Sequence, residues 1–205
     1  MDVSRPSRWR VIPSAPPEEH RSIAATFTAR VRGTADGWDA PTPVAGWRAR
    51  DVVRHLITWF PGFIAAGSDV TLQPGPSVEE DPVAAWEHQV TALQAVLDDP
   101  ANADRMFRHP HLPETPLPQA VSRFYTADVF MHTWDLARAT GQDDRLDPDY
   151  CRTLYEGMEP MDQVLRQSGQ YGARIPVPED ADWQTKLLGF IGRDPEWRAP
   201  LTVPR

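Results

Sequence analysis

The sequence predicts an all-α protein, an up-and-down bundle of four helices with a short C-terminal extension. Several segments place apolar residues three and four positions apart, which is typical of amphipathic helices. Pro, Gly and capping residues fall at the ends of these segments, where helices begin and end. Alternation typical of strands is weak throughout the chain. Amphipathic helices with few strands favour a helical bundle.

The first predicted elements are separated by Pro- and Gly-rich segments. Residues 1–17 are rich in Pro and are expected to form an N-terminal arm, and residues 18 to about 33 combine helical periodicity with an acidic start. Residues 38–47 contain Pro and Gly and are predicted to be a loop. The next helix should begin near Ala49 with a broad apolar face, and Pro61 should kink it because proline lacks a backbone donor.

The third helix is predicted over residues 81–99, after a Gly- and Pro-containing loop at residues 70–80. Asp81 is a suitable N-cap, and Pro82 suits the first helical position because its missing N–H would have no helical partner there. A connection at residues 100–114 follows it.

The remaining chain predicts two more long helices and a tail. A helix over residues 116–141 should end at Gly141, and a fifth helix should cover about 147–168. An extended piece (173–181) and a short helix (182–191) follow. We therefore expect residues 18–168 to form the bundle and residues 169–205 to form an extension that packs on it.

The composition is that of a globular protein and excludes several classes of function. The length of 205 residues is enough for one sizeable domain. The chain is 40% hydrophobic and 24% charged, as is usual for a globular protein. The net charge of −8, without a basic stripe, argues against nucleic acid as a partner. No apolar run suits a membrane span and the first 30 residues lack a signal-peptide core, so we expect a cytoplasmic protein without a membrane partner. The single cysteine, Cys151, excludes internal disulfides and is expected to be a small core residue.

The helix predicted for residues 116–141 carries polar residues on a mostly apolar surface. Asp128 and His132 are four positions apart and share one helix face, and Asp135 follows three positions later. An apolar helix tends to be buried, and a buried carboxylate must be paired or bound to a metal. The alternative is an exposed Asp128–His132 pair, because such short motifs recur by chance.

His55 lies on the apolar side of the second predicted helix. A lone histidine there is more often a hydrogen-bonded core residue than a metal ligand. If this helix faces Asp128 and His132, however, the three side chains can surround one metal ion and leave a position open, as in catalytic zinc sites.

Four other histidines compete for this role. His109 and His111 flank a proline in a loop, and such a pair is more often on the surface than at a metal. His20 and His88 lie among charged residues, and we expect both to be solvated.

Three segments of the chain resemble one known family. "WDAPTPVAGWRARDVVRHL" (38–56) is similar to the N-terminal signature of mycothiol-dependent maleylpyruvate isomerase-like proteins, which belong to the DinB/YfiT-like helical bundles. "ADVFMHTWDLARATG" (127–141) resembles the second ligand segment of that family. "KLLGFIGRDPEW" (186–197) resembles the closing segment of an actinobacterial metal-binding subgroup. The segments occur in the expected order and span most of the chain.

The resemblance implies a DinB/YfiT-like four-helix bundle with a divalent metal, usually zinc, held by His55, Asp128 and His132. It also implies mycothiol, the thiol of actinobacteria, as a cosubstrate. Lys186 is the single lysine among the 21 basic residues, and this Arg-rich composition fits such a source. The isomerase itself carries Glu where this chain has Asp128 and has a longer C-terminal region, so the resemblance implies the metal site rather than maleylpyruvate as substrate.

Two neutral histidines and one carboxylate around Zn²⁺ leave a net charge of about +1, which favours the thiolate form of a bound thiol. The function expected is therefore a mycothiol-using transferase or isomerase that acts on a small electrophile. Asp135 is the candidate catalytic residue that would orient a metal-bound histidine, and a helix-end cap or surface charge is an equal alternative. Arg193 is the candidate for binding an anionic cosubstrate, against the alternative of a surface arginine.

Two other functions stay open on the sequence. The same ligands could activate water in a metal-dependent hydrolase, with Asp135 as the general base. A metal-binding protein without catalytic activity is the third interpretation. Nickel or iron could replace zinc, since histidine and carboxylate sites accept several metals. The eight tryptophans also raise a homodimer as a possibility to check by sizing.

Overall fold

The computed structural model describes residues 11–110, 112–167 and 169–200. Residues 1–10 of the expected N-terminal arm and His111 of the competing histidine pair lie outside the described residues. The helices are α1 (Pro16–Gly33), α2 (Ala49–Gly67), α3 (Pro82–Asp98), α4 (Leu117–Ala120), α5 (Ala127–Thr140), α6 (Pro148–Met158), α7 (Asp162–Gln167) and α8 (Trp183–Phe190). Single turns and short irregular helices are η1 (Gly37–Asp39), η2 (Pro100–Asn102), η3 (Val121–Thr126) and η4 (Glu159–Met161). The predicted all-α fold is confirmed, with one small antiparallel pair, β1 (Met106–Phe107) and β2 (Thr115–Pro116).

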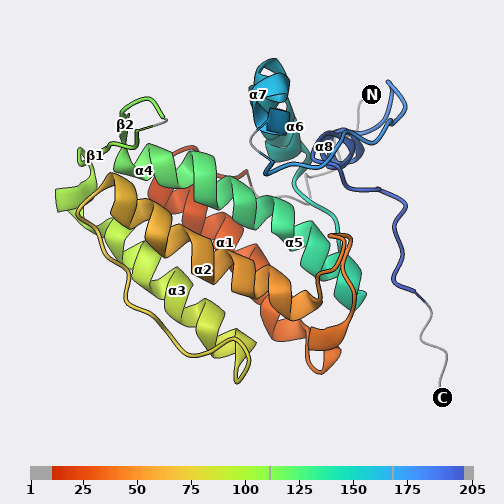
Figure 1. Cartoon of the computed structure of the whole chain (residues 1–205), viewed down its shortest axis with the longest axis horizontal. Helices are drawn as coiled ribbons and strands as arrows, with labels where there is room; N and C mark the ends of the chain where they lie inside the picture. The colour runs from red at the N-terminus through yellow and green to blue at the C-terminus, as the bar shows by residue number, and fades with distance from the viewer. Residues whose placement is uncertain (1–10, 111, 168, 201–205) are drawn as a thin grey trace, which may run out of the picture.

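Four long helical segments form the bundle: α1, α2, α3 and the continuous run from α4 to α5 (Figure 1). Both α1 and α2 pack against α3 and α5, so α1 and α2 lie diagonally across the bundle. Pro61 lies within α2, which continues to Gly67. The predicted caps of α3 are present, since Asp81 accepts a hydrogen bond from the backbone N–H of Ala84.

The directions of the helices differ from the strict up-and-down alternation that we predicted. An ion pair between Arg21 and Asp98 joins the start of α1 to the end of α3, so these two helices are antiparallel. Glu79 lies just before α3 and pairs with Arg50 at the start of α2. Therefore α2 and α3 begin at the same end and run in the same direction, as Figure 1 shows. Residues 68–81 make this possible because an extended chain of that length can return along the whole bundle.

The helix predicted over residues 116–141 is present but changes its winding. Between Val121 and Thr126 it is a π-helix, and the backbone N–H of Ala127 bonds to the carbonyl of Ser122, five residues earlier. One extra residue in a turn shifts every later side chain by about 100° around the helix axis. The helix ends where predicted, with Gly141 in the left-handed conformation at φ 68°.

The fifth predicted helix is divided, and it lies beside the bundle. It breaks at η4, which contains Pro160, because proline removes a helical hydrogen bond. In Figure 1 α6, α7 and α8 stand together at one side, and α6 packs closely on α8. Cys151 in α6 is fully buried, as expected of a core residue.

The division of the chain into arm, bundle and extension stays a prediction. None of the described helices is both long and apolar enough to cross a bilayer.

His20 is a correction to the sequence prediction, because it is fully buried in α1 rather than solvated. Its Nδ1 lies 3.1 Å from the hydroxyl of Thr126, and its Nε2 has no hydrogen-bond partner among the described residues. An imidazolium needs two acceptors, so this environment favours the neutral ring. Burial, with a smaller contribution from Arg21, lowers the pKa of His20 from 6.5 to about 4, against an opposing effect of Asp98.

We expect His20 to make the fold sensitive to acid. The unfolded chain takes up the His20 proton below pH 6.5 and the folded chain only near pH 4, so stability falls as the pH falls through this window. The loss is about 3 kcal/mol at pH 4, since each pKa unit is worth about 1.4 kcal/mol. Urea unfolding of wild type and His20→Gln between pH 7 and 4 measures it. The variant should lose less stability on acidification, and equal losses in both proteins would contradict this assignment.

Candidate metal centre

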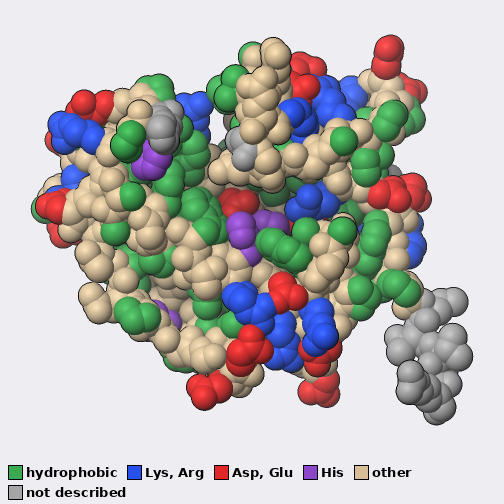
Figure 2. Space-filling view, in the orientation of Figure 1, with side chains coloured by type: hydrophobic (Ala, Val, Ile, Leu, Met, Phe, Trp, Pro, Cys, Tyr) green, Lys and Arg blue, Asp and Glu red, His purple; other side chains and the backbone are tan. Residues whose placement is uncertain are grey.

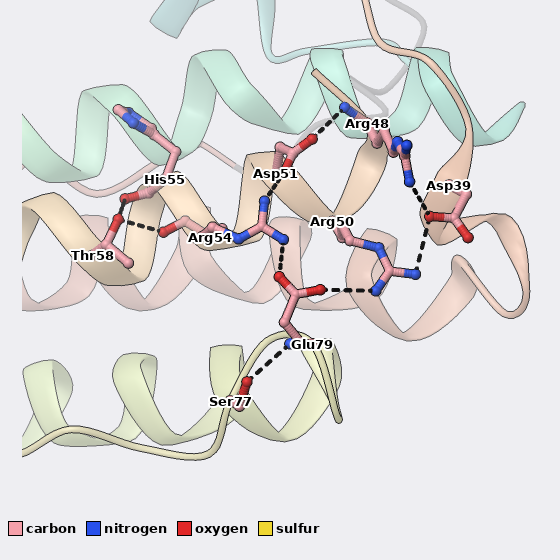
Figure 3. A network of polar contacts seen from close by, with 9 residues as sticks. All are labelled: Asp39, Arg48, Arg50, Asp51, Arg54, His55, Thr58, Ser77 and Glu79. Atoms are coloured by element: carbon pink, nitrogen blue, oxygen red, sulfur yellow. Dashed lines mark hydrogen bonds and ion pairs between the residues drawn. The ribbon is translucent and has the colours of Figure 1, made fainter. Parts of the chain in front are cut away.

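The start of α2 is fixed by a capping box and a network of ion pairs (Figure 3). The carboxylate of Asp51 accepts the backbone N–H of Arg48 at 2.7 Å, which satisfies a donor at the helix start. Three arginines at this end pair with three carboxylates, so the network carries little net charge: Arg48, Arg50 and Arg54 with Asp39, Asp51 and Glu79. In Figure 3 the side chain of His55 projects away from this network, towards α5.

His55, Asp128 and His132 come together between α2 and α5. Their nearest donor atoms all lie within 4.8 Å of one another. Nε2 of His55 is 3.0 Å from Oδ2 of Asp128, and Nε2 of His132 is 3.5 Å from Oδ1 of the same carboxylate. The structure thus places the three predicted ligands in one cluster, although 73 positions separate His55 from Asp128 in the sequence.

The donor atoms suit a divalent transition metal. Two imidazole nitrogens and one carboxylate oxygen form a ligand set typical of zinc, and nickel or iron can use the same set. The side chains of His55, Asp128 and His132 are 31%, 20% and 7% exposed, so solvent reaches the cluster from one side. Figure 2 shows histidine side chains in a hollow at the middle of this face, where α2 and α5 lie in Figure 1. The residues therefore fit a metal with an open position.

Asp135 lies directly behind His132 and is fully buried, so its interpretation as a surface charge is wrong. Its Oδ2 accepts a hydrogen bond from Nδ1 of His132 at 2.9 Å. A proton on Nδ1 leaves the lone pair of Nε2 directed at the cluster, which is the form that binds metals. Burial raises the pKa of Asp135, but the hydrogen bond from His132 and the charge of Arg193 together outweigh it and hold the pKa below its usual value.

Arg193 reaches Asp135 from the C-terminal extension, 58 positions away. Its Nε and Nη2 donate to Oδ1 and Oδ2 of Asp135 at 2.9 and 3.0 Å, a two-pronged ion pair. The side chain is only 16% exposed, so it is not the surface arginine that we considered. Two of its three nitrogens face Asp135, and its predicted contact with an anionic cosubstrate stays a prediction.

Aromatic side chains that the sequence analysis did not single out border the cluster. The indole N–H of Trp59 donates to Oδ2 of Asp128 at 3.1 Å and so fixes the carboxylate. The ring of Trp47 stacks on His132, with 5.7 Å between centroids and 17° between planes. Trp59 is four positions after His55, so helical spacing could have identified it. Trp47 precedes α2 in a loop, and no spacing rule places it here.

Comparisons with known proteins show the family to which the chain is similar. Residues 20–137 match the family model described as the mycothiol maleylpyruvate isomerase N-terminal domain. Two curated relatives are uncharacterized proteins of Mycobacterium tuberculosis, from strains CDC 1551 and H37Rv. Each is 30% identical over 173 residues, which cover 82% of this chain and 91% of the relative. No solved structure matches the chain significantly.

The matched region carries the candidate site almost in full. It includes His55, Asp128, His132 and Asp135, and it ends before α6 and the C-terminal extension. The match covers more than half of the chain, and it agrees with the helical bundle of the structure. The chain therefore belongs to the family of the mycothiol maleylpyruvate isomerase N-terminal domain.

Proposed function

We propose that this protein is a metal-dependent, mycothiol-using transferase or isomerase that acts on a small electrophilic molecule. One observation carries the proposal: the donor atoms of His55, Asp128 and His132 lie within 4.8 Å of one another in a partly open hollow. Membership of a family named for mycothiol supports the thiol cosubstrate. Zinc is the first candidate for the metal. When bound, it would lower the pKa of a coordinated thiol and favour the thiolate, which is the nucleophilic form.

The residues of the chain prepare this site in three ways. Asp135 holds the proton of His132 on Nδ1, so that Nε2 is available as a ligand. Trp59 fixes the orientation of the Asp128 carboxylate through its indole N–H. Trp47 covers one face of the His132 ring and limits the access of water to it.

The class of reaction follows from the chemistry of a thiolate, which adds to electrophilic carbon atoms. For an electrophile with an activated double bond, a carbon–sulfur bond forms and the thiol proton passes to the neighbouring carbon, so nothing leaves. The product is a conjugate, and it becomes an isomer of the substrate if the thiol is later eliminated after rotation about the former double bond.

A hydrolase is supported less well by the structure. Asp135 was the candidate general base, but it is fully buried and both of its oxygens accept hydrogen bonds from His132 or Arg193. A general base must reach the water that it deprotonates. The described geometry therefore favours thiol chemistry over water activation.

A thiol-consumption assay tests the proposal. Zinc-loaded protein is incubated with mycothiol and an α,β-unsaturated carbonyl compound, and loss of free thiol is followed against the uncatalysed rate. We expect acceleration by wild type and about a hundredfold less by His132→Ala, because the loss of a ligand should cost at least as much as the loss of a group that orients one. Wild type without acceleration but with ester or amide cleavage would indicate the hydrolase. Binding of mycothiol without either reaction would indicate a non-catalytic metal-binding protein. Either of these two results would overturn the proposal.

A further inference from the structure

We propose that the C-terminal extension completes the metal centre, with Arg193 acting as a positioning residue for His132 through Asp135. The inference rests on the metal site proposed above and adds a part of the chain that the family match at residues 20–137 does not include. Three links form a continuous chain of contacts: Arg193 to Asp135, Asp135 to His132, and His132 to the cluster with Asp128.

The first link is a fixed geometry rather than a loose surface pair. Asp135 is fully buried, and the planar guanidinium meets both of its oxygens. A planar fork fixes the plane of the carboxylate as well as its distance, which a lysine ammonium cannot do. With its plane fixed, Oδ2 is held 2.9 Å from Nδ1 of His132 and so holds the imidazole ring in place.

The extension holds Arg193 in position by its own backbone. The residue before it, Gly192, has φ 81°, a conformation that side chains other than glycine rarely adopt. A Cβ at Gly192 would lie 2.9 Å from both the carbonyl oxygen of Ala173 and the Cα of Gly172, so the two segments need this glycine to approach. The backbone N–H of Arg193 also bonds to the carbonyl of Leu188 in α8 at 2.9 Å.

A second arginine anchors the same extension without contacting the site. Nη2 of Arg138 donates to the carbonyl of Pro195 at 2.7 Å, and its Nη1 pairs with Asp144 at 3.0 Å. Arg138 thus offers a matched control, because its guanidinium bonds to the same extension but pairs with Asp144 and Pro195 rather than with Asp135, and Lys at this position keeps the charge.

The experiment is a double-mutant cycle on the affinity of the full chain for Zn²⁺, measured by competition with a chromophoric chelator. Asp135→Asn should weaken binding by roughly 10- to 100-fold, the usual effect of losing a group that orients a ligand. Arg193→Lys keeps the charge and should weaken binding by about tenfold. In the Asp135→Asn background Arg193→Lys should have no further effect, because residues that act through one another are not additive. Arg138→Lys should leave the affinity unchanged.

A spectroscopic measurement separates positioning of the ligand from general stability. The visible spectrum of the Co²⁺-substituted protein reports on ligand geometry, and we expect it to change in Arg193→Lys but not in Arg138→Lys. Unchanged affinity and spectrum in Arg193→Lys, or additive effects in the cycle, would overturn this inference and leave the proposed metal site intact. Wild type that binds no Zn²⁺ would instead overturn the metal site itself, and the inference with it.

Discussion

Replacing His132 by alanine should abolish stoichiometric metal binding. His132 is the least exposed of the three clustered residues, and its Nδ1 is held by Asp135. With only His55 and Asp128 left, the site falls below the three protein ligands typical of catalytic zinc centres. We expect wild type, purified without chelators and offered Zn²⁺, to hold about one ion per chain and the variant almost none. Elemental analysis after gel filtration measures this directly.

The same substitution should remove the stabilisation that the metal gives. A ligand at a hundredfold excess over its dissociation constant raises the unfolding free energy by about 2.7 kcal/mol. Wild type should show this gain on addition of Zn²⁺, and His132→Ala should show none. His88→Ala is the matched control, because His88 lies on α3 with its Nε2 3.0 Å from the carbonyl of Gln73 and is not part of the cluster. If His132→Ala keeps the full gain, the ion is bound elsewhere.

Helical spacing is sufficient to identify Asp128 and His132 as candidate ligands on α5, because residues four apart share a face whatever surrounds the helix. It was also sufficient to place α1, α2 and α3 to within a few residues, since Pro and acidic residues mark their starts. The meeting of His55 with Asp128 could not be derived from spacing alone. It depends on α2 and α5 being neighbours, which the packing of the whole bundle determines.

The parts that the sequence did not predict depend on long-range contacts. The π-helix at Val121–Thr126 has no local sequence signature, yet it rotates the side chains of α5 about the helix axis and so determines the direction in which Asp128 points. The parallel course of α2 and α3 depends on how residues 68–81 lie along the bundle. The charged neighbours of His20 predict a solvated side chain, but His20 lies on the face of α1 that packs into the core. In each case tertiary packing outweighs the local pattern.

Asp135 and Arg193 show the same limit at the site itself. The sequence predicts a separate role for each residue, an orienting group for Asp135 and an anion contact for Arg193. Their pairing joins α5 to a segment 58 positions later, and nothing in either local sequence requires it. The pairing changes the meaning of both residues, because a buried carboxylate without its cation is an uncompensated charge.

Arg193→Gln should therefore destabilise the metal-free protein severely, by about 3–5 kcal/mol, the usual cost of removing one partner of a buried ion pair. Asp135 would remain fully buried, and of its two side-chain donors among the described residues His132 alone would be left. The double variant Asp135→Asn with Arg193→Gln should be less destabilised than Arg193→Gln alone, because no unpaired charge is left inside. Urea unfolding in the presence of a chelator measures both.

Arg198→Gln is the matched control, since Arg198 lies in the same extension with a side chain that is 63% exposed and pairs with Glu196. It should change stability by no more than about 0.5 kcal/mol, as surface substitutions usually do. If Arg193→Gln costs as little as Arg198→Gln, the carboxylate of Asp135 does not depend on the guanidinium. If the double variant is as unstable as Arg193→Gln alone, the loss comes from packing of the arginine side chain, because removing the charge of Asp135 would then have relieved nothing.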